Sequence, residues 1–308
     1  MRTLVTGGAG FIGSHIVEAL LSRGDSVRVL DNFSSGRRDN LKDLRGNLEV
    51  LDGDLRDSGV VKASVKNIDL VFHLAALVSV SQSMKDPEAC FTINVGGTVA
   101  LMDAARLAGV GRMVLSSSTA VYGDTDVFPT TEETPLRPLS PYALSKQVNE
   151  LYASLYTHTL GFHVMALRYF NVYGPRQRPD SDYAAAIPIF LSRLAARQPI
   201  IIYGDGRQSR DFIFVRDVVR ANLMAAESNT GGQVFNICSG HETNLLDLME
   251  ELSTISLHQP EVRFEPPRTG DIFRSVGSPD RAAAEFGFRA QTSLADGLAQ
   301  TIAWMKSS

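Results

Sequence analysis

The feature that most constrains the fold is a glycine-rich turn at the start of the chain. The β-prone stretch Thr3–Thr6 leads into Gly7, Gly10 and Gly13, and a helical pattern covers Phe11–Arg23. Glycine suits a sharp turn whose backbone must approach a pyrophosphate closely, and a helix that begins there directs free N–H groups toward the phosphates. A strand, a GxxGxxG turn and a helix in this order predict a dinucleotide-binding unit.

Strand and helix patterns alternate through the first half of the chain. Two long helical patterns cover Pro87–Ala108 and Pro141–Leu160. This alternation predicts right-handed crossovers and an α/β fold with a doubly wound parallel sheet, and nearly continuous apolar strands indicate that helices cover both faces. The predicted strands are Thr3–Thr6, Ser26–Asp31, Leu48–Leu51, Leu70–His73, Met113–Ser116 and His163–Arg168.

The pattern changes after Arg168, where prolines and glycines separate shorter elements. We therefore expect residues 1–168 to form the cofactor-binding domain and residues 169–308 to form mainly a smaller substrate-binding lobe. A segment near 211–240, and Gln233–Cys238 within it, is expected to return to the main sheet.

Composition argues against several classes of protein. A net charge of −4 argues against a nucleic-acid-binding protein, which carries a concentrated basic surface. Cys90 and Cys238 form no CxxC pair, so we expect neither a metal site nor a disulfide framework. We find no signal-like segment and no apolar stretch near the roughly 20 residues of a membrane span, so we expect a cytoplasmic protein without a membrane partner.

Asp31 ends the second predicted strand, 18 residues after Gly13. A carboxylate there accepts hydrogen bonds from the adenosine ribose and repels a 2′-phosphate, which favours NAD over NADP. The alternative is a turn aspartate before Asn32. Arg37 and Arg38 are nearby cations that can tolerate a phosphate, so NADP stays a lesser alternative.

Tyr142 and Lys146 have a YxxxK spacing, which puts both side chains on one face of the second long helical pattern. A nearby ammonium favours the phenolate, and lowering a tyrosine pKa from about 10 to near neutrality takes about 4 kcal/mol. Alone, this spacing is commonly a solvated helix face. Upstream, however, a strand ends in serines at the sheet edge where doubly wound folds bind ligands. We expect Ser118 to be catalytic, and Ser116 and Ser117 to cap the turn.

Several segments together carry a specific resemblance. The chain contains, in the order found in the extended short-chain dehydrogenases/reductases, the segments TGGAGFIGSH, DNFSSG, HLAA, SSSTAVYG, PYALSKQVNE, RYFNVYGPRQ and RTGD. Over almost its whole length it most resembles the UDP-hexose 4-epimerases of that family. The resemblance implies a Rossmann domain with a small C-terminal lobe, in which Tyr142 is the acid/base, Lys146 its partner and Ser118 the bridge to the sugar O4.

The same resemblance implies an NAD site spread over the first domain, with a lining that begins at the glycine turn and ends near the sixth strand. The residues expected to contact NAD are Gly7, Gly10, Phe11, Ile12, Gly13, Asp31, Asn32, Ser34, Gly36, Asp54, Leu55, Leu74, Ala75, Ala76, Asn94, Ser116, Tyr142, Lys146 and Tyr169.

The resemblance assigns a substrate role to Ser118, Asn171, Tyr203, Arg210, Arg268, Asp271 and Ser275. The arginines would hold the nucleotide diphosphate, because their forks match phosphate geometry, and the tyrosine would pack on the uracil. In the resembling epimerases, the residue four positions after the RxGD aspartate borders the sugar C2 substituent. Counting from Asp271 gives Ser275, which leaves room for an N-acetyl group unless the loop is shifted. We therefore expect UDP-GlcNAc/UDP-GalNAc as substrates, with UDP-Glc/UDP-Gal allowed.

The type of reaction depends on two positions beside the catalytic hydroxyl. Relatives that dehydrate or decarboxylate sugars carry an acid there, whereas this chain has Thr119 and Ala120. The resemblance thus favours NAD-mediated oxidation at C4 followed by reduction from the opposite face. One alternative is a UDP-glucuronate 4-epimerase, in which Arg176 or Arg178 faces the C6 carboxylate. The others are an oxidoreductase that releases NADH and a non-catalytic NAD-binding regulator.

The two long helical patterns also bear on assembly. In relatives, the corresponding helices pack against their copies in a symmetric four-helix bundle, so the resemblance implies a homodimer. Their apolar stripes can equally face only the sheet, which is the alternative.

Overall fold

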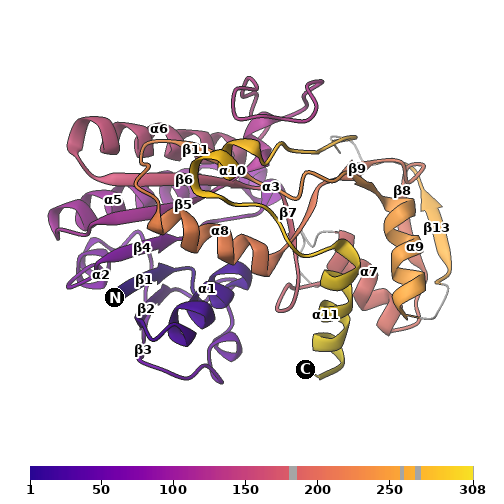
Figure 1. The fold of residues 1–308 in the computed structure, drawn as a ribbon, viewed down its shortest axis with the longest axis horizontal. Helices are drawn as coiled ribbons and strands as arrows, with labels where there is room; N and C mark the ends of the chain where they lie inside the picture. The colour runs from indigo at the N-terminus through magenta and orange to yellow at the C-terminus, as the bar shows by residue number, and fades with distance from the viewer. Residues whose placement is uncertain (180–185, 257–259, 268–271, 308) are drawn as a thin grey trace.

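The computed structural model describes residues 1–179, 186–256, 260–267 and 272–307. Its central strands are β1 (Arg2–Thr6), β2 (Ser26–Asp31), β3 (Leu48–Asp52), β4 (Leu70–His73), β5 (Arg112–Ser118), β6 (His163–Tyr169) and β11 (Val234–Ile237). They form one seven-stranded sheet in the order β11-β6-β5-β4-β1-β2-β3, and all pairs are parallel (Figure 1). Strand order reverses between β1 and β4, and doubly wound sheets bind ligands at the carboxyl ends of the strands flanking such a point.

This sheet confirms the predicted α/β fold. Each strand predicted in the first half of the chain is present, and β11 lies within the segment that was expected to return to the sheet. β5 extends two residues beyond the prediction, to Ser118, because its pairing with β6 continues as far as Tyr169.

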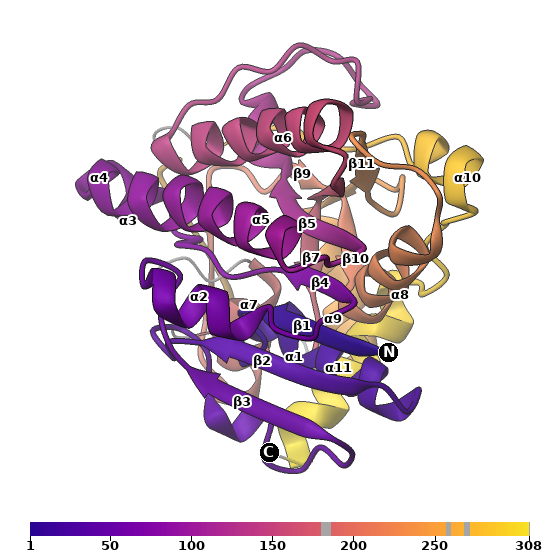
Figure 2. The ribbon, with the colours of Figure 1, turned by 90° about the vertical axis from the view of Figure 1, so that its left-hand side faces the viewer.

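Helices cover both faces of this sheet (Figure 2). One layer consists of α2 (Ser58–Ser64), α5 (Gly97–Leu107) and α6 (Pro141–Leu160), and the other of α1 (Phe11–Ser22), α8 (Val215–Glu227) and α10 (Asp280–Phe286). Successive side chains of each strand point to opposite faces of the sheet, so the apolar core is divided between the two helix layers. Leu115 packs with α5 and α6, and its neighbour Val114 packs with α1 and α8. Apolar packing therefore fills both faces of the sheet, so a polar ligand can bind only at the strand ends.

The first long helical pattern is interrupted. After α3 (Val80–Lys85), the chain forms α4 (Pro87–Phe91), then a π-helical turn over Thr92–Gly96, and continues into α5. Such turns widen a helix by one residue and commonly mark functional sites. Here the turn contains the buried Asn94.

The second long helical pattern is one continuous helix, α6, as predicted. The Ser140 hydroxyl accepts a hydrogen bond from the Ala143 N–H, and Pro141 occupies the first turn, where its missing N–H has no consequence. Gly161 ends the helix in the left-handed conformation, at φ 67°. These caps define both ends of α6.

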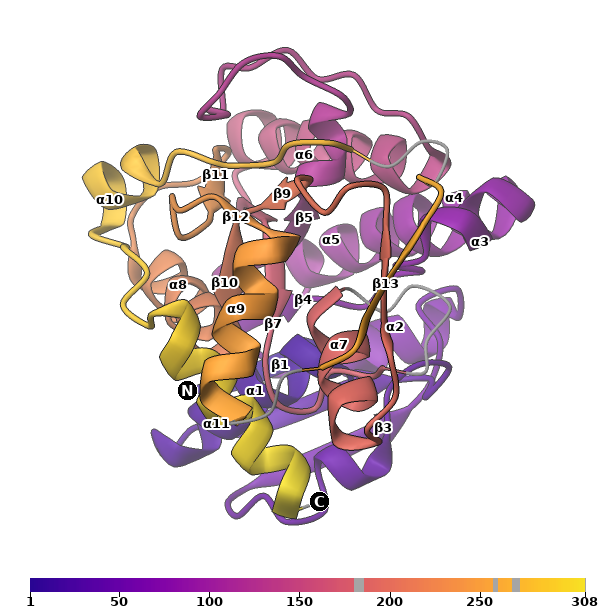
Figure 3. The same ribbon diagram turned by 90° about the vertical axis from the view of Figure 1, so that its right-hand side faces the viewer.

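The second half of the chain forms a smaller lobe beside the carboxyl ends of the strands (Figure 3). It contains β7 (Asn171–Tyr173), β8 (Ile200–Tyr203), β9 (Ser209–Arg210), β10 (Phe212–Phe214), β12 (Thr243–Asn244), β13 (Val262–Glu265), α7 (Ala186–Ala195), α9 (Leu245–Ser256) and α11 (Leu294–Ser307). Tyr173, Phe190 and Phe214 belong to its separate apolar core. Short 3-10 helices η1 (Arg38–Asn40) and η3 (Thr119–Tyr122) complete the described elements.

The second half of the chain also contributes to the main sheet more than the sequence predicted. Besides α8 and β11, helix α10 packs there, with the ring of Phe286 at 5.1 Å from that of Phe235 on β11. Within the described residues, no helix has the length and apolar character needed to cross a bilayer.

Candidate active site

The glycine turn lies between β1 and α1 and is closed tightly by neighbouring backbone. Gly7 has φ 69°, and a Cβ on it would lie 2.7 Å from the Ala75 backbone nitrogen. A Cβ on Gly13 would overlap the carbonyl oxygen of Gly7. Gly10 is the N-cap of α1 and supplies no side-chain cap, so the first N–H groups of the helix remain available to an anion. This cradle fits a pyrophosphate.

Asp31, at the end of β2, is buried beside this cradle. Its carboxylate accepts hydrogen bonds from the backbone N–H groups of Ala9 at 2.9 Å and Phe33 at 2.8 Å. Burial raises the pKa of Asp31, and the two N–H donors oppose that rise. A Cβ on Gly36 would lie 3.0 Å from an Asp31 oxygen, so this glycine keeps the space around the carboxylate open.

The residues predicted for the adenosine end form a polar cluster on the loops after β2 and β3. Asn32 donates to Asp54 at 2.8 Å and accepts from the Ser34 hydroxyl at 2.7 Å. Arg56 holds the pKa of Asp54 well below its usual range through their hydrogen bonds. The Leu55 side chain points away into the core, so only its backbone can face an adenine.

Arg37 and Arg38 are the cations that left NADP as an alternative cofactor, and the structure gives Arg38 protein partners. Arg38 pairs with Asp52 at 2.5 Å and lies over the Phe33 ring at 3.9 Å. Asp52 is the register partner of Asp31 on the neighbouring strand. Two carboxylates side by side disfavour a 2′-phosphate.

Leu74, Ala75 and Ala76 follow β4 directly, opposite the glycine turn. The Leu74 N–H donates to the Thr6 carbonyl at 3.1 Å, which fixes this segment against β1. Asn94 was predicted to contact NAD, but its side-chain amide is engaged with protein. It donates to the Leu77 carbonyl at 3.0 Å and accepts from the Leu77 N–H at 2.7 Å. These bonds hold Asn94 against the segment after β4, and its contact with NAD stays a prediction.

Three further predicted cofactor residues are positioned mainly by packing. Phe11 and Ile12, in the first turn of α1, contact the small-lobe core and so join the two lobes. Tyr169 is buried, and its hydroxyl donates to Asn222 on α8 at 2.9 Å. Burial raises the pKa of Tyr169, so this phenol stays protonated.

The predicted catalytic residues lie together where β5 ends against α6. The Lys146 ammonium donates to the Ser116 carbonyl at 2.9 Å and lies 3.4 Å from its hydroxyl. The same Nζ is 5.8 Å from the centre of the Tyr142 ring. Tyr142 and Ser118 share a side-chain hydrogen bond. The spacing read from the sequence thus brings a phenol, an amine and a hydroxyl to one point.

Tyr142 and Lys146 both have shifted pKa values. Burial raises the pKa of Tyr142, and the hydrogen bond with Ser118 only partly offsets this. Burial also lowers the pKa of Lys146 to about 8. Burial therefore dominates the pKa of Tyr142 in the protein alone. The expected lowering relied on the lysine and the nicotinamide charge together, so it stays a prediction for the NAD-bound enzyme.

The roles of the three serines also need correction. Ser116 and Ser117 were expected to cap the turn, but Ser116 holds Lys146 and the Ser117 hydroxyl donates to Glu150 at 2.5 Å. Ser118 is the residue that caps η3, since its hydroxyl accepts from the Ala120 N–H at 3.2 Å. The turn thus holds the Ser118 hydroxyl on the side of Tyr142.

Three of the predicted substrate residues, Asn171, Tyr203 and Arg210, lie on β7, β8 and β9 of the small lobe, in three separate two-stranded sheets. Both the backbone N–H and the side-chain amide of Asn171 donate to the Asp211 carbonyl, next to Arg210. The Ser275 N–H donates to the Ser209 carbonyl at 3.1 Å, so Ser275 lies beside β9. Tyr203 ends β8, in the same lobe. The other two predicted residues, Arg268 and Asp271, lie outside the described residues.

Buried groups that the sequence analysis missed connect these parts. Asp211 accepts from the N–H groups of Ser239 at 2.8 Å and Gly240 at 3.0 Å, which ties the small lobe to the end of β11. The Asn236 side chain donates to the Thr130 carbonyl at 3.0 Å, and the Thr130 N–H donates to Val276 beside Ser275. Isolated polar residues in apolar strands were the only available signal.

Arg176, one of the two cations considered for a glucuronate site, is already paired. It contacts Glu18 on α1 at 2.8 Å, and the neighbouring Pro175 carbonyl contacts His15 at 2.9 Å. This arrangement uses Arg176 to hold the loop after β7 against α1.

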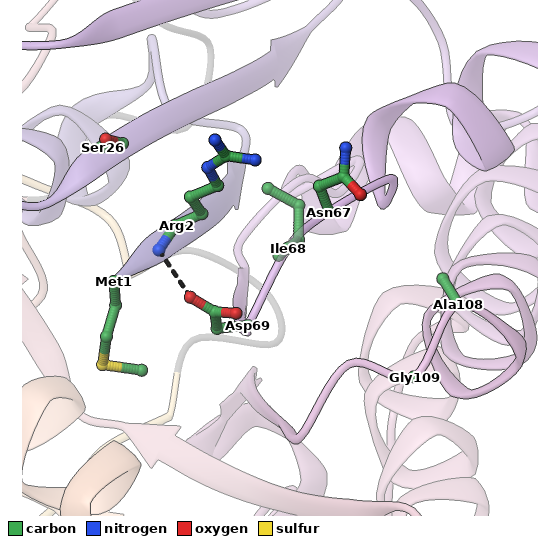
Figure 4. Close-up of a pocket in the computed structure, with 8 residues that line it drawn as sticks. All are labelled: Met1, Arg2, Ser26, Asn67, Ile68, Asp69, Ala108 and Gly109. Carbon is green, nitrogen blue, oxygen red and sulfur yellow. Dashed lines mark hydrogen bonds between the residues drawn. The ribbon is translucent and has the colours of Figure 1, made fainter.

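A hollow at the opposite edge of the sheet is separate from this site (Figure 4). The Arg2 N–H donates to the Asp69 carboxylate there at 2.8 Å. None of the predicted site residues lines it. Its lining residues are Met1, Arg2, Ser26, Asn67, Ile68, Asp69, Ala108 and Gly109.

A Rossmann-type sheet, a glycine cradle beside an aspartate, and a serine, tyrosine and lysine at the carboxyl edge define an NAD-dependent enzyme of the short-chain dehydrogenase/reductase class. The model of the NAD dependent epimerase/dehydratase family matches residues 3–238, and the chain belongs to this family.

Similar proteins agree with this assignment. A UDP-glucose 4-epimerase of Mycolicibacterium smegmatis is 40% identical over 100% of this chain and 99% of its own length. The solved UDP-N-acetylglucosamine 4-epimerase of Methanobrevibacter ruminantium M1, in complex with UDP-N-acetylmuramic acid, superposes with a TM-score of 0.95 at 37% identity, covering 99% of this chain and 98% of that one. A Thermus thermophilus UDP-glucose 4-epimerase solved with NAD gives 0.90 at 37%, covering 100% of both.

Relatives with other chemistry also match. A dTDP-glucose 4,6-dehydratase of an Actinoplanes species is 35% identical over 100% of this chain and 98% of its own length. Identity over the whole chain thus defines the family and its cofactor, and the residues around the catalytic hydroxyl must distinguish the reaction.

The cradle gives a direct prediction. Gly13→Ala should weaken NAD binding on the order of tenfold or more, because the added Cβ overlaps the Gly7 carbonyl and displaces the turn. Calorimetric titration of the apoprotein with NAD measures this. Gly96→Ala is the control, because the new Cβ would make only an ordinary contact, 3.9 Å from the Phe91 carbonyl oxygen. Equal NAD affinity in Gly13→Ala and the unaltered protein would contradict the assigned cradle.

Proposed function

We propose that this protein is a UDP-sugar 4-epimerase that interconverts UDP-GlcNAc and UDP-GalNAc and also accepts UDP-Glc and UDP-Gal. The observation that carries the proposal is the meeting of Ser118, Tyr142 and Lys146 at the carboxyl edge of the sheet. Whole-length similarity to UDP-glucose and UDP-N-acetylglucosamine 4-epimerases supports the same reaction.

Tyr142 and Ser118 transfer the proton of the sugar O4 hydroxyl. Tyr142 takes the proton from the sugar O4 and later returns it, and Ser118 bridges the two oxygens. Because burial raises the pKa of Tyr142, the phenol is protonated at neutral pH until positive charge gathers beside it. Lys146, held by Ser116, supplies part of that charge. When bound, NAD supplies the hydride acceptor at C4 and the further positive charge.

Simple reversal of the oxidation is favoured over elimination. Thr119 and Ala120, in η3 beside Ser118, provide no carboxylate to remove a proton from C5. This separates the chain from its dehydratase relatives despite their similar identity. The pairing of Arg176 with Glu18 removes part of the support for a glucuronate substrate.

The sugar preference rests on Ser275. Backbone hydrogen bonds hold it beside Ser209, and the next residue, Val276, accepts from Thr130. These two backbone hydrogen bonds support the placement of Ser275 beside Arg210 and the other expected substrate residues. A serine at this position leaves space for the N-acetyl group at C2.

We further propose that two copies pair through the outer face of α3, α4 and α6. Leu144, Leu151 and Leu155 follow one another at helical spacing on α6 and are exposed, Leu151 by 65%. Met84 on α3 and Phe91 on α4 expose 59% and 61% beside them. A patch of this kind on a soluble protein favours self-association, and a second copy offers the same apolar face.

The reaction is tested by incubating the protein separately with UDP-GlcNAc, UDP-Glc and UDP-glucuronate, without added cofactor, and identifying products by chromatography. We expect UDP-GalNAc and UDP-Gal to form without net NADH, read from absorbance. Tyr142→Phe should lower kcat by about 10²–10⁴-fold, since it removes the acid/base. Tyr152→Phe, farther along α6, is the control and should keep normal turnover. Stoichiometric NADH, or normal rates in Tyr142→Phe, would contradict the proposal.

The pocket argument has its own test. Ser275→Tyr should abolish turnover of UDP-GlcNAc while UDP-Glc is still converted, because the larger side chain fills the space at C2. Ser275→Ala should convert both. The ratio of kcat/KM for the two substrates is the measurement. An unchanged ratio in Ser275→Tyr would show that this residue does not border the sugar.

Assembly is tested by light scattering after gel filtration. We expect twice the chain mass of 33.5 kDa for the unaltered protein and a single chain mass for Leu151→Glu, because a charge would lie in the apolar contact. Leu246→Glu, on α9 in the other lobe, should not change the mass. A single chain mass for the unaltered protein rules the pairing out.

A further inference from the structure

A buried ion pair lies directly behind the catalytic residues. Glu150 and Arg168 are 5% and 4% exposed and join through two hydrogen bonds, of 2.8 and 2.7 Å. Glu150 follows Lys146 by one helical turn on α6, and Arg168 is on β6. Removing two charges from water is costly, and an apolar pair would often be as stable or more stable. Fold stability alone therefore does not account for the pair.

The pair connects three elements at the level of the reaction site. Ser117 on β5 is the register partner of Arg168 on β6, and both side chains reach Glu150. The residues on either side of Ser117 are the two that hold the catalytic groups. Ser116 contacts Lys146, and Ser118 contacts Tyr142.

Arg168 also reaches the turn that carries the catalytic serine. Its guanidinium donates to the Tyr122 hydroxyl at 2.8 Å, and Tyr122 ends η3, which begins next to Ser118. The Tyr122 hydroxyl in turn donates to Asn236 on β11 at 2.6 Å. Glu150 and Arg168 thus contact the helix, the strand end and the turn whose relative placement the reaction requires.

We propose that the Glu150–Arg168 pair positions the catalytic residues by fixing α6 against the ends of β5 and β6, which holds the Lys146 ammonium at the Ser116 carbonyl. This inference rests on the proposed function. It makes Glu150 and Arg168 positioning residues, which act through Lys146, Tyr142 and Ser118.

The charges around Lys146 provide a readout of its placement relative to Glu150. Burial raises the pKa of Cys90 on α4 and of Tyr142 on α6, and it lowers the pKa of His73 on β4 to about 3. These three groups are therefore neutral at neutral pH. Burial lowers the pKa of Lys146, and Cys90 and Glu150 are the groups that oppose this, in that order. Because the Cys90 thiol is neutral, Glu150 is the member of the two that is ionised at neutral pH. Removing that charge should move the pKa of Lys146 from about 8 to a lower value.

The test uses three variants of the full chain. Glu150→Gln removes the charge and keeps the shape. The double variant Glu150→Met/Arg168→Met replaces the pair by apolar side chains of similar size, which commonly preserves a fold, so it carries the test if the single variant does not fold. Asp217→Asn is the matched control, because Asp217 is also a buried carboxylate paired with an arginine, Arg220, at 2.7 Å, but lies outside the site.

Two readouts separate positioning from stability. The first is the titration of ¹⁵N-labelled lysine Nζ by NMR, with the Lys146 signal assigned by its loss in Lys146→Met. We expect titration near pH 8 in the unaltered protein and Asp217→Asn, and at lower pH in both Glu150 variants. The second is kcat, which should fall in both Glu150 variants by on the order of tenfold to a hundredfold with little change in KM, as misplacement of reacting groups does.

A lower titration pH of Lys146 together with a lower kcat in the folded double variant supports the proposal. An unchanged titration, or a normal kcat, in that variant overturns it and makes the pair a stabilising contact only. The titration needs no substrate, so it still decides the matter if the unaltered protein proves inactive on UDP-sugars. Inactivity would count against the proposed function instead.

Discussion

The arrangement of this protein depends on one constraint, which is that a parallel sheet covered by helices on both faces has polar surface only at its ends. Apolar side chains alternate between the layer of α5 and α6 and the layer of α1 and α8, so neither face can hold a polar ligand. Every strand of the sheet points the same way, and the carboxyl ends of β1, β2, β4 and β5 lie along one edge. The glycine turn, Asp31 and Ser118 each directly follow or end one of these strands, which is why residues far apart in the sequence form one site.

Much of the fold and the cofactor side could be predicted from sequence because their signals are local. A glycine turn, a strand-ending aspartate and a YxxxK spacing each involve neighbouring residues, and strand alternation gives the sheet. α6 was predicted to its ends because Ser140 and Gly161 are strong caps. The π-helical turn at Thr92–Gly96 was not foreseen, because it depends on Asn94 reaching across to Leu77.

The features that the sequence did not reveal share a physical origin. The roles of Ser116, Ser117 and Ser118 depend on which strand face each occupies and on what α6 places opposite, and neither is written in a run of three serines. The pKa of Tyr142 depends on desolvation, which a helical spacing cannot reveal. The buried partners Glu150 and Arg168 lie 18 positions apart, and only the packing of α6 on β6 brings them together. Local patterns thus identify the reacting groups, and tertiary packing sets their ionisation.

The hydrogen bonds that run from Tyr122 through Asn236 to Thr130 have a consequence for how this enzyme can diversify. Thr130 belongs to the long connection between η3 and α6, and its N–H and carbonyl pair with Val276 and Ser278, in the stretch that contains Ser275. Suppose that recombination imported the C-terminal stretch from a relative without the connection between η3 and α6. The backbone N–H and carbonyl groups that now pair between the two segments would then lose their hydrogen-bond partners. Changes in this C-terminal stretch should therefore be inherited more readily as paired exchanges of both segments than as transplants of one.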